Sequence, residues 1–272
     1  MGGDPPHQPR TALGVDMSVS IENLKVPLGG RPILKGLSLD LPGGEVSGLI
    51  GPNGCGKTTL LRSIAGLLPL QGGSISWRHR QVAQMKAGER ARQIAILPQS
   101  AQAPEGMKVA DLVARGRSPH LRPFRPMSKV DRDAVQRALA DVGLEHLGDR
   151  PVAALSGGQR QRAWIAMVLA QDTPLVLLDE PTTFLDLPHQ VDILRLARRL
   201  STEHGKTVVM VLHDLNFAAR FCDRIAALKE GQLVAEGAPE TVLTQQTIGQ
   251  MFGMTCRILS DPRHNTPFVL PD

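Results

Sequence analysis

The sequence predicts an α/β protein built on a mainly parallel β-sheet, with an antiparallel β region near its N-terminus. From residue 46 onward, apolar runs of strand length alternate with longer segments of helical periodicity, and strands separated by helices form parallel βαβ units. The runs at 175–178 and 208–212 are wholly apolar, as expected of buried strands. With 272 residues, the chain can bury a substantial core without disulfides or metals.

The N-terminal part begins with a stretch that has no apolar core of its own. Residues 1–16 are rich in proline and glycine and are predicted to form a disordered tail, which precedes a single domain over 17–272. Apolar residues are spaced as in strands at 19–26 and 37–41. A Pro-Gly-Gly turn then leads into the apolar strand 46–51.

The remaining elements alternate between helix and strand. The stretch from about 100 to 172 is nearly all helical, with prolines that interrupt it, and we expect it to form a lobe beside the sheet. Helices are also predicted from Lys57 to about Leu67 and from Pro188 to about His204. Further strands are expected at 74–77, 94–97, 175–179, 207–212, 225–228 and 232–234.

Composition limits the partners and the compartment. The formal net charge of +5 favours acidic partners only weakly, and with 3% aromatic residues a stacking platform for nucleic acid is not expected. No run approaches the roughly 20 apolar residues that cross a bilayer, and the N-terminus lacks the apolar stretch of a secretory signal. Three widely spaced cysteines agree with a reducing compartment. We therefore expect a cytoplasmic protein that binds no nucleic acid and serves a membrane only from its side.

A glycine-rich motif follows the strand at 46–51 directly. It fits the pattern G-x-x-x-x-G-K-[ST] and reads Gly51-Pro52-Asn53-Gly54-Cys55-Gly56-Lys57-Thr58-Thr59. Glycines let backbone N–H groups curl around a polyphosphate, and the helix that follows presents its positive end to the same anion. Lys57 can reach the terminal phosphates, and Thr58 can offer its hydroxyl to Mg²⁺. The motif predicts a nucleoside triphosphate site, which kinases and GTPases share.

Two adjacent acids form a second motif. The apolar strand at 175–178 ends in Asp179 and Glu180, which places both at the crevice where α/β sheets bind ligands. Asp179 is predicted to hold Mg²⁺, and Glu180 to orient or deprotonate the attacking water. Two acids at a helix start also favour the helix dipole, but together with the phosphate loop they describe one metal–nucleotide site.

A third motif resembles the LSGGQ signature of ABC ATPases, at the spacing from the phosphate loop that is typical of that family. It reads Leu155-Ser156-Gly157-Gly158-Gln159, although the same residues also suit an ordinary capping turn that opens a helix. Three further residues match family elements in sequence order. Gln99 resembles the Q-loop glutamine that senses the metal site, Asp186 the D-loop aspartate, and His213 the switch histidine that contacts the γ-phosphate. By this resemblance the fold is a P-loop NTPase of the ABC ATPase type with a helical subdomain.

The resemblance implies a head-to-tail homodimer in which ATP, with Mg²⁺, lies between the phosphate loop of one copy and Ser156–Gln159 of the other. It also implies permease subunits in the membrane, an extracytoplasmic binding protein, and a peripheral position on the cytoplasmic side. The segments 112–120 and 159–171 look most like ATPases of ferric-siderophore importers, of the ferric-enterobactin type. Importers of haem or cobalamin are the near alternatives. A soluble non-transport ABC ATPase is disfavoured, because no long coiled coil separates the motifs.

Several positions carry separate expectations. Leu28 stands where ABC ATPases usually carry an aromatic residue that stacks on adenine, which predicts reduced discrimination of adenine from guanine. Cys55 lies among phosphate-binding amides at a helix start, where the pKa of a thiol tends to fall, although an inert loop residue is the alternative and the more common case. Arg115 and Arg117 lie in the segment where the family docks its permease, and they are either docking charges or ordinary solvated ones. The chain has no cluster of ligands suited to iron.

Overall fold

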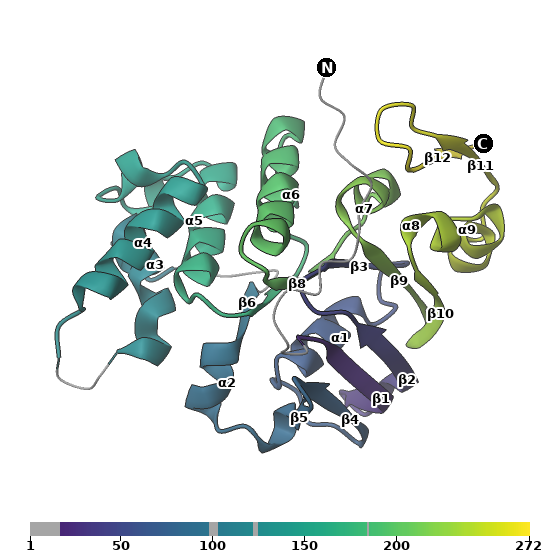
Figure 1. Ribbon diagram of the computed structural model, residues 1–272, viewed down its shortest axis with the longest axis horizontal. Coiled ribbons are helices and arrows are strands. Elements are labelled where there is room, and N and C mark those ends of the chain that lie inside the picture. The colour runs from purple at the N-terminus through teal and green to yellow at the C-terminus, as the bar shows by residue number, and fades with distance from the viewer. Residues whose placement is uncertain (1–16, 98–102, 122–124, 184) are drawn as a thin grey trace.

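The computed structural model describes residues 17–97, 103–121, 125–183 and 185–272, and a six-stranded sheet runs through its middle (Figure 1). The strand order is β10-β9-β3-β8-β7-β6. The parallel strands are β3 (Val46–Ile50), β6 (Ile94–Leu97), β7 (Leu175–Leu178), β8 (Thr207–Val211) and β9 (Arg224–Lys229). At one edge, β10 (Gln232–Gly237) runs antiparallel to β9. The predicted parallel core is confirmed, whereas the tail predicted over residues 1–16 lies outside the described residues.

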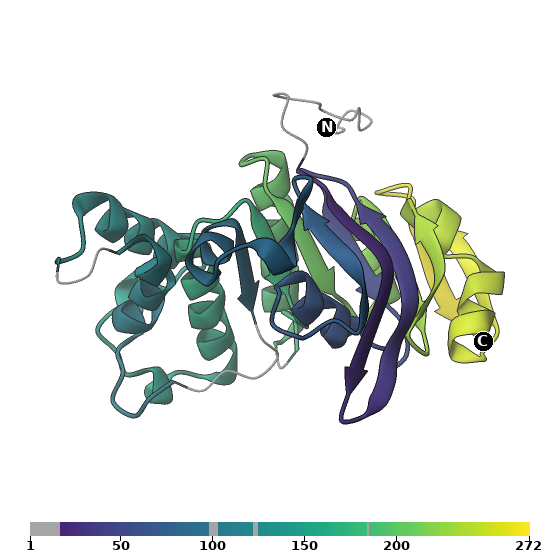
Figure 2. The ribbon, with the colours of Figure 1, turned by 90° about the horizontal axis from the view of Figure 1, so that it is seen from below.

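A helical lobe lies beside the sheet, next to its β6 edge (Figure 1, Figure 2). Its helices α3 (Val109–Ala114), α4 (Lys129–Asp141) and α5 (Gly157–Ala170) pack on one another. The helix α2 (Ala87–Gln93) leads into β6. Short 3₁₀ turns occupy Val82–Gln84, Arg115–His120, Glu145–Leu147 and Val152–Ala154. The expected lobe is therefore present, and its predicted span includes 100–102 and 122–124, which lie outside the described residues.

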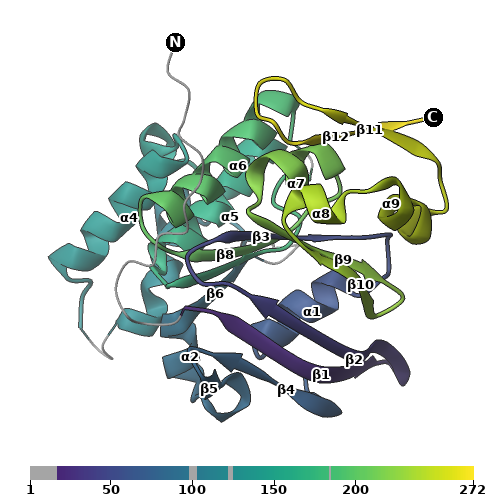
Figure 3. The same cartoon turned by 45° about the vertical axis from the view of Figure 1, so that its right-hand side comes forward.

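A second sheet is antiparallel and packs against α1 (Lys57–Ile64). Its order is β2-β1-β4-β5, from β1 (Val19–Leu28), β2 (Arg31–Leu41), β4 (Gly72–Trp77) and β5 (Arg80–Gln81). Because α1 contacts β1, β2 and β8, it lies between the two sheets (Figure 3). Leu24, Leu60 and Trp77 are almost wholly buried in the apolar core that these elements share. The antiparallel region predicted from the N-terminal sequence is confirmed.

The C-terminal third contains the expected long helix α6 (Leu187–Thr202), together with three short helices and a hairpin that were not predicted from the sequence. These are α7 (Leu215–Phe221), α8 (Pro239–Val242), α9 (Gln245–Phe252) and a hairpin of β11 (Cys256–Ser260) and β12 (Pro267–Pro271). The hairpin lies beside α7 (Figure 3). Within the described parts of the chain, no helix is both long and apolar enough to cross a membrane.

Three neighbouring parallel strands bring their carboxyl ends to one edge of the central sheet. In the order β3-β8-β7, the strands are followed by Gly51, by Leu212 and His213, and by Asp179 and Glu180. The carboxyl edge of such a sheet is where α/β proteins bind ligands. The fold therefore gathers three of the predicted motifs at one place.

Candidate functional site

The predicted phosphate loop, Gly51–Thr59, connects β3 to α1. Gly51 and Gly56 have φ angles of 147° and 110°, which residues with a Cβ rarely adopt. At Gly51 a Cβ would also lie 2.1 Å from a carbonyl oxygen of β9, so only glycine fits there. Lys57 is buried, and its Nζ donates to the carbonyl oxygens of Gly51 (2.8 Å) and Pro52 (2.9 Å). The loop thus curls around its own lysine.

Thr58 and Asp179 meet at the start of α1. The Thr58 hydroxyl donates to Asp179 Oδ1 at 2.9 Å. The other oxygen, Oδ2, is buried and has no hydrogen-bond partner among the residues that the structure describes. Burial raises the pKa of the Asp179 carboxyl. A buried carboxylate oxygen without a partner is costly, and Mg²⁺ takes oxygen ligands of this kind, so these residues fit a Mg²⁺ ion.

Glu180 and His213 come together across the same edge. His213 Nε2 lies 2.8 Å from Glu180 Oε1, and the Thr183 hydroxyl donates to Glu180 Oε2 at 3.2 Å. Both carboxylate oxygens are therefore held in place. Glu180 also has a φ of 51°, a left-handed conformation that costs of order 1–3 kcal/mol in a residue with a side chain and concentrates at functional sites.

A cavity of about 450 Å³ is lined by the phosphate loop on one part of its wall and by Glu180 and His213 on another. One side is apolar, from Leu28, which is 54% exposed, and Ile33. The other side is polar, so the cavity suits a ligand with a flat ring at one end and a polyanion at the other. Its lining residues are Leu28, Ile33, Asn53, Gly54, Gly56, Lys57, Thr58, Thr59, Glu180 and His213.

The signature segment lies elsewhere, at the start of α5 in the helical lobe. Ser156 caps this helix: its hydroxyl accepts from the Gln159 N–H at 3.2 Å, and the Gln159 side chain accepts from the Ser156 N–H at 3.1 Å. The predicted helix start is confirmed. Among the described residues that line the cavity, none belongs to Ser156–Gln159. The first turn of α5, with Gly157 exposed, instead faces solvent.

One more predicted site residue, Asp186, is also apart from the cavity. Asp186 precedes α6 and pairs with His189, one turn later. Gln99 lies outside the described residues. Two lining or contact residues were given no role by the sequence analysis: Ile33, across the β1–β2 hairpin from Leu28, and Thr183. The Gly29-Gly30 turn of that hairpin was the signal that could have placed Ile33 opposite Leu28.

The expected fall in the pKa of Cys55 is wrong. The thiol is only 4% exposed and lies beneath the phosphate loop. Burial raises its pKa above the ordinary value of 9.0, although Lys57, with Nζ 3.9 Å from the sulfur, acts in the opposite direction. Desolvation of the thiolate therefore outweighs the nearby positive charge.

We accordingly expect Cys55 to alkylate slowly in the folded protein. Its raised pKa leaves less thiolate at pH 7 than an ordinary thiol has, so the rate should be lower than that of an exposed cysteine and should rise with pH. Peptide mass spectrometry after iodoacetamide treatment measures the rate at Cys55 itself, with Cys55→Ser as the control. Alkylation should block ATP binding and bound ATP should protect. Rapid labelling of folded protein at neutral pH would contradict this prediction.

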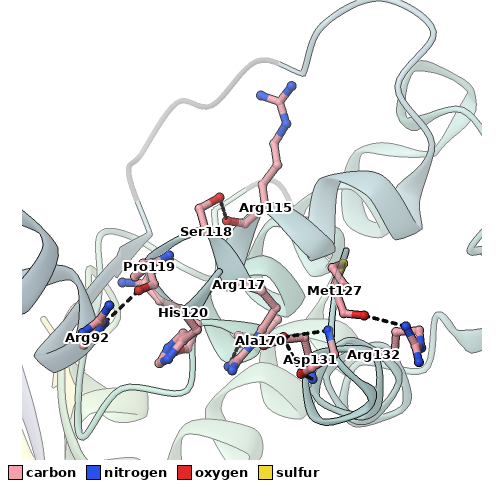
Figure 4. Close-up of polar contacts among 12 residues, drawn as sticks. Arg92, Arg115, Arg117, Ser118, Pro119, His120, Met127, Asp131, Arg132 and Ala170 are labelled. Atoms are coloured by element: carbon pink, nitrogen blue, oxygen red, sulfur yellow. Dashed lines mark hydrogen bonds and ion pairs between the residues drawn. The ribbon is translucent and has the colours of Figure 1, made fainter. Parts of the chain in front are cut away.

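The two arginines of segment 112–120 differ in kind (Figure 4). Arg117 is buried; its Nε donates to Asp131 Oδ1 at 2.9 Å and its Nη1 to the Ala170 carbonyl oxygen at 2.8 Å. It is thus neither a docking charge nor a solvated one, and both expectations for it are wrong. Arg115 is exposed and points away from this cluster (Figure 4).

Comparison with known families agrees with the geometry of the site. A family model described as "ABC transporter" matches residues 34–183, more than half of the chain. The chain belongs to the ABC transporter family. The match spans the phosphate loop, the signature segment and the acids that follow β7.

Relatives within this family are similar over nearly the whole chain. The probable siderophore transport system ATP-binding protein YusV of Bacillus subtilis is 47% identical, over 93% of this chain and 92% of its own length. The ferric enterobactin transport ATP-binding protein FepC of Escherichia coli is 45% identical, with 92% of each chain covered. The hemin import ATP-binding protein HmuV of Streptomyces coelicolor is 40% identical, over 98% of this chain and 94% of its own.

Solved ABC structures are similar as well. An ABC transporter in an inward-facing conformation superposes with a TM-score of 0.81 at 28% identity, over 95% of this chain and 98% of that one. A bacterial ABC transporter cassette solved as a dimer gives a TM-score of 0.72 at 30% identity, over 81% and 98%. The fold predicted from the sequence, an ABC ATPase cassette, is confirmed.

Proposed function

We propose that this chain is the ATP-binding and ATP-hydrolysing subunit of an ABC importer of ferric siderophores. The observation that carries the ATPase activity is the cavity in which the phosphate loop, Thr58, Glu180 and His213 converge. The cargo rests on the relatives, since those at 45–47% identity include proteins named for siderophore or ferric enterobactin transport. Haem import is the second candidate, supported by the hemin relative at 40%.

The phosphate loop binds the triphosphate. Backbone N–H groups of Asn53–Thr59 surround the β- and γ-phosphates, and the positive end of α1 adds to their attraction. Lys57 Nζ then exchanges its two carbonyl partners for phosphate oxygens, which are stronger acceptors. Thr58 and Asp179 would hold Mg²⁺, which neutralises phosphate charge when bound. Gln99 is assigned to the same metal site from its place in the sequence.

Glu180 is the general base in this proposal. A carboxylate close to the attacking water accepts its proton as the water oxygen bonds to the γ-phosphorus and the bond from that phosphorus to the β-phosphate oxygen breaks, which releases ADP. His213 and Thr183 hold the two oxygens of Glu180, so the carboxylate keeps its orientation without a rearrangement during the reaction. His213 is exposed on the cavity side, where it is also placed to contact the γ-phosphate.

The site is completed by a second copy of the chain. Ser156, Gly157, Gly158 and Gln159 open a helix in each copy, and a helix start is an anion-binding element. Because this element is exposed and remote from its own cavity, we assign it to the ATP of the partner copy, with Asp186 at the same interface. The related cassette solved as a dimer supports a paired arrangement.

Docking to the permease is assigned to the helical lobe, on the cytoplasmic side of the membrane. Arg115 is the exposed charge of segment 112–120, and Arg117 fixes the turn that carries it. An extracytoplasmic binding protein delivers the cargo to the permease, so this chain contacts neither the binding protein nor the iron. Within the described residues, no group of three or more His, Cys, Asp or Glu side chains is placed to hold a metal ion.

Uptake measurements test the cargo. Deleting the coding sequence should abolish uptake of iron from ferric siderophores and leave uptake of hemin and cobalamin intact. Complementation with the wild-type chain should restore it, and complementation with Lys57→Ala should not. Loss of hemin or cobalamin uptake alone would assign the chain to the corresponding alternative importer.

Leu28→Tyr is expected to strengthen ATP binding by up to about tenfold and to widen the preference for ATP over GTP. An aromatic ring at this position would stack on adenine, which is worth roughly 0.5–1.5 kcal/mol beyond buried area. Titration with fluorescent ATP and GTP analogues measures both affinities. Leu259→Tyr, at a similarly exposed leucine remote from the cavity, is the control. Unchanged affinities for both nucleotides would refute the stacking role.

A further inference from the structure

Asn216, three residues after His213, ties the helix α7 to the C-terminal hairpin. Its Oδ1 accepts from the Val269 N–H at 2.7 Å, and its Nδ2 donates to the Val269 carbonyl oxygen at 3.3 Å. One amide side chain therefore satisfies both backbone groups of one residue of β12. In Figure 3 the hairpin lies directly beside α7, and the two elements are in contact.

The alternating direction of the backbone groups along an antiparallel hairpin explains why β12 presents this N–H and C=O to α7. In an antiparallel pair, the N–H and C=O of each residue point to the same side, and successive residues alternate. Val269 is opposite Ile258 of β11, and since its polar groups reach Asn216, they face away from β11. The Val269 side chain is itself only 4% exposed. Asn216 thus supplies the two hydrogen bonds that a neighbouring third strand would otherwise make with the backbone of Val269.

The connection between β8 and α7 is anchored at both ends. On the β8 side, the Leu212 N–H donates to the Leu49 carbonyl oxygen at 3.1 Å. On the α7 side, Asp214 caps the helix by accepting from the N–H groups of Asn216 (2.8 Å) and Phe217 (2.9 Å). His213 lies between the two anchors and is exposed. Its place therefore depends on where α7 begins.

The helix α7 cannot fix the position of His213 by itself. It has only seven residues, and isolated helices shorter than about 12 residues are marginal in water. Tertiary contacts must hold it. Near its start, Leu215 packs against the core and the Asn216–Val269 pair supplies the side-chain hydrogen bonds, whereas Ala218, Ala219 and Phe221 are buried further along the helix.

We propose that Asn216 is a positioning residue for ATP hydrolysis. Its contact with the hairpin β11–β12 fixes the start of α7 and so keeps His213 in contact with Glu180. The inference rests on the proposed function, in which His213 orients the general base. A small displacement is sufficient to matter, since misplacing a reacting group by about 1 Å can cost on the order of a hundredfold in rate.

Steady-state kinetics of the assembled transporter test this role. Asn216→Ala should lower kcat at least about tenfold and change the KM for ATP by less than about twofold, because the phosphate loop keeps its contacts. Val269→Pro should produce the same pattern with Asn216 intact, since it removes the N–H from which Asn216 accepts, and this N–H faces away from the β11 ladder. Phe268→Ala is the control, because Phe268 is exposed on the same strand.

A double-mutant cycle with His213→Ala separates positioning from stability. If Asn216 acts through His213, adding Asn216→Ala to His213→Ala causes no further loss of kcat. Losses that multiply, or a loss in Asn216→Ala that follows only the fraction of unfolded protein, would overturn the inference while leaving the ATPase assignment standing. Full turnover in His213→Ala alone would overturn both the role of His213 and this inference.

Discussion

Glu180→Gln is expected to stop ATP turnover while ATP remains bound. Glutamine keeps the size of the side chain, but it cannot accept the proton of the attacking water. Loss of a general base typically costs 10²–10⁴-fold in rate, about 3–5 kcal/mol in activation free energy. In the proposed head-to-tail dimer, hydrolysis is the step that releases the two copies, so the variant should accumulate as an ATP-bound pair. Phosphate release and light scattering in the presence of ATP measure the two effects.

The control for Glu180→Gln is Glu203→Gln, the same change at an exposed residue beyond the end of α6. It should hydrolyse ATP at the wild-type rate and separate into single chains afterwards. Full hydrolysis in Glu180→Gln would show that the base lies elsewhere. A variant that binds ATP and remains single, both in solution and with its permease, would contradict the head-to-tail dimer.

Arg117→Met is expected to destabilise the helical lobe by about 3–5 kcal/mol, since it leaves a carboxylate buried without its countercharge. The Arg117 and Asp131 side chains are only 6% and 10% exposed. The guanidinium also joins the turn at Arg115–His120 to the end of α5 through the Ala170 carbonyl. Urea unfolding measures the loss, and binding of the variant to its permease should weaken in parallel.

Arg115→Met is the matched control for stability. Because this arginine is exposed, its replacement should change the free energy of unfolding by no more than about 0.5 kcal/mol. If Arg115 is the docking charge, this control should still bind the permease less tightly. Equal urea midpoints for Arg117→Met and the wild type would show that the buried pair adds no stability.

The Arg117–Asp131 pair also gives stability a pH dependence. The Ser128 hydroxyl, followed by the Arg117 guanidinium, holds the pKa of the Asp131 carboxyl below its ordinary value. A carboxyl whose pKa is lower in the folded state contributes stability above its ordinary pKa, and this contribution is lost as the pH falls through the folded value. The wild type should therefore lose stability below about pH 4, and Arg117→Met should lose less over the same range.

The features that the sequence analysis predicted well are those with a local physical cause. The phosphate loop needs glycine at positive φ and a lysine at a helix start, and both requirements are met by neighbouring residues. The strands at 175–178 and 207–211 are wholly or almost wholly apolar because both faces are buried. The signature segment contains its own capping box, so Ser156 and Gln159 mark a helix start without any distant partner.

The features that escaped prediction depend on residues far apart in the chain. Arginine is mostly exposed in proteins. No residue near Arg117 in the sequence indicates that it is buried against Ala170, 53 residues later. The pKa of Cys55 rises because the loop buries the thiol, a balance between desolvation and Lys57 that only the three-dimensional arrangement decides. The elements α7, α8 and α9 are too short to show a periodicity.

The strand order has a consequence for biosynthesis. The strand that carries the phosphate loop, Val46–Ile50, pairs with Thr207–Val211 and Arg224–Lys229, so it has no partner until the ribosome has added the greater part of the chain. At about 5–20 residues per second, that wait is roughly 8–30 s. During synthesis an apolar strand edge stays open to other nascent chains. Because Gly51 packs against the Leu228 carbonyl oxygen, the nucleotide-binding loop reaches its final surroundings only after translation has passed residue 228.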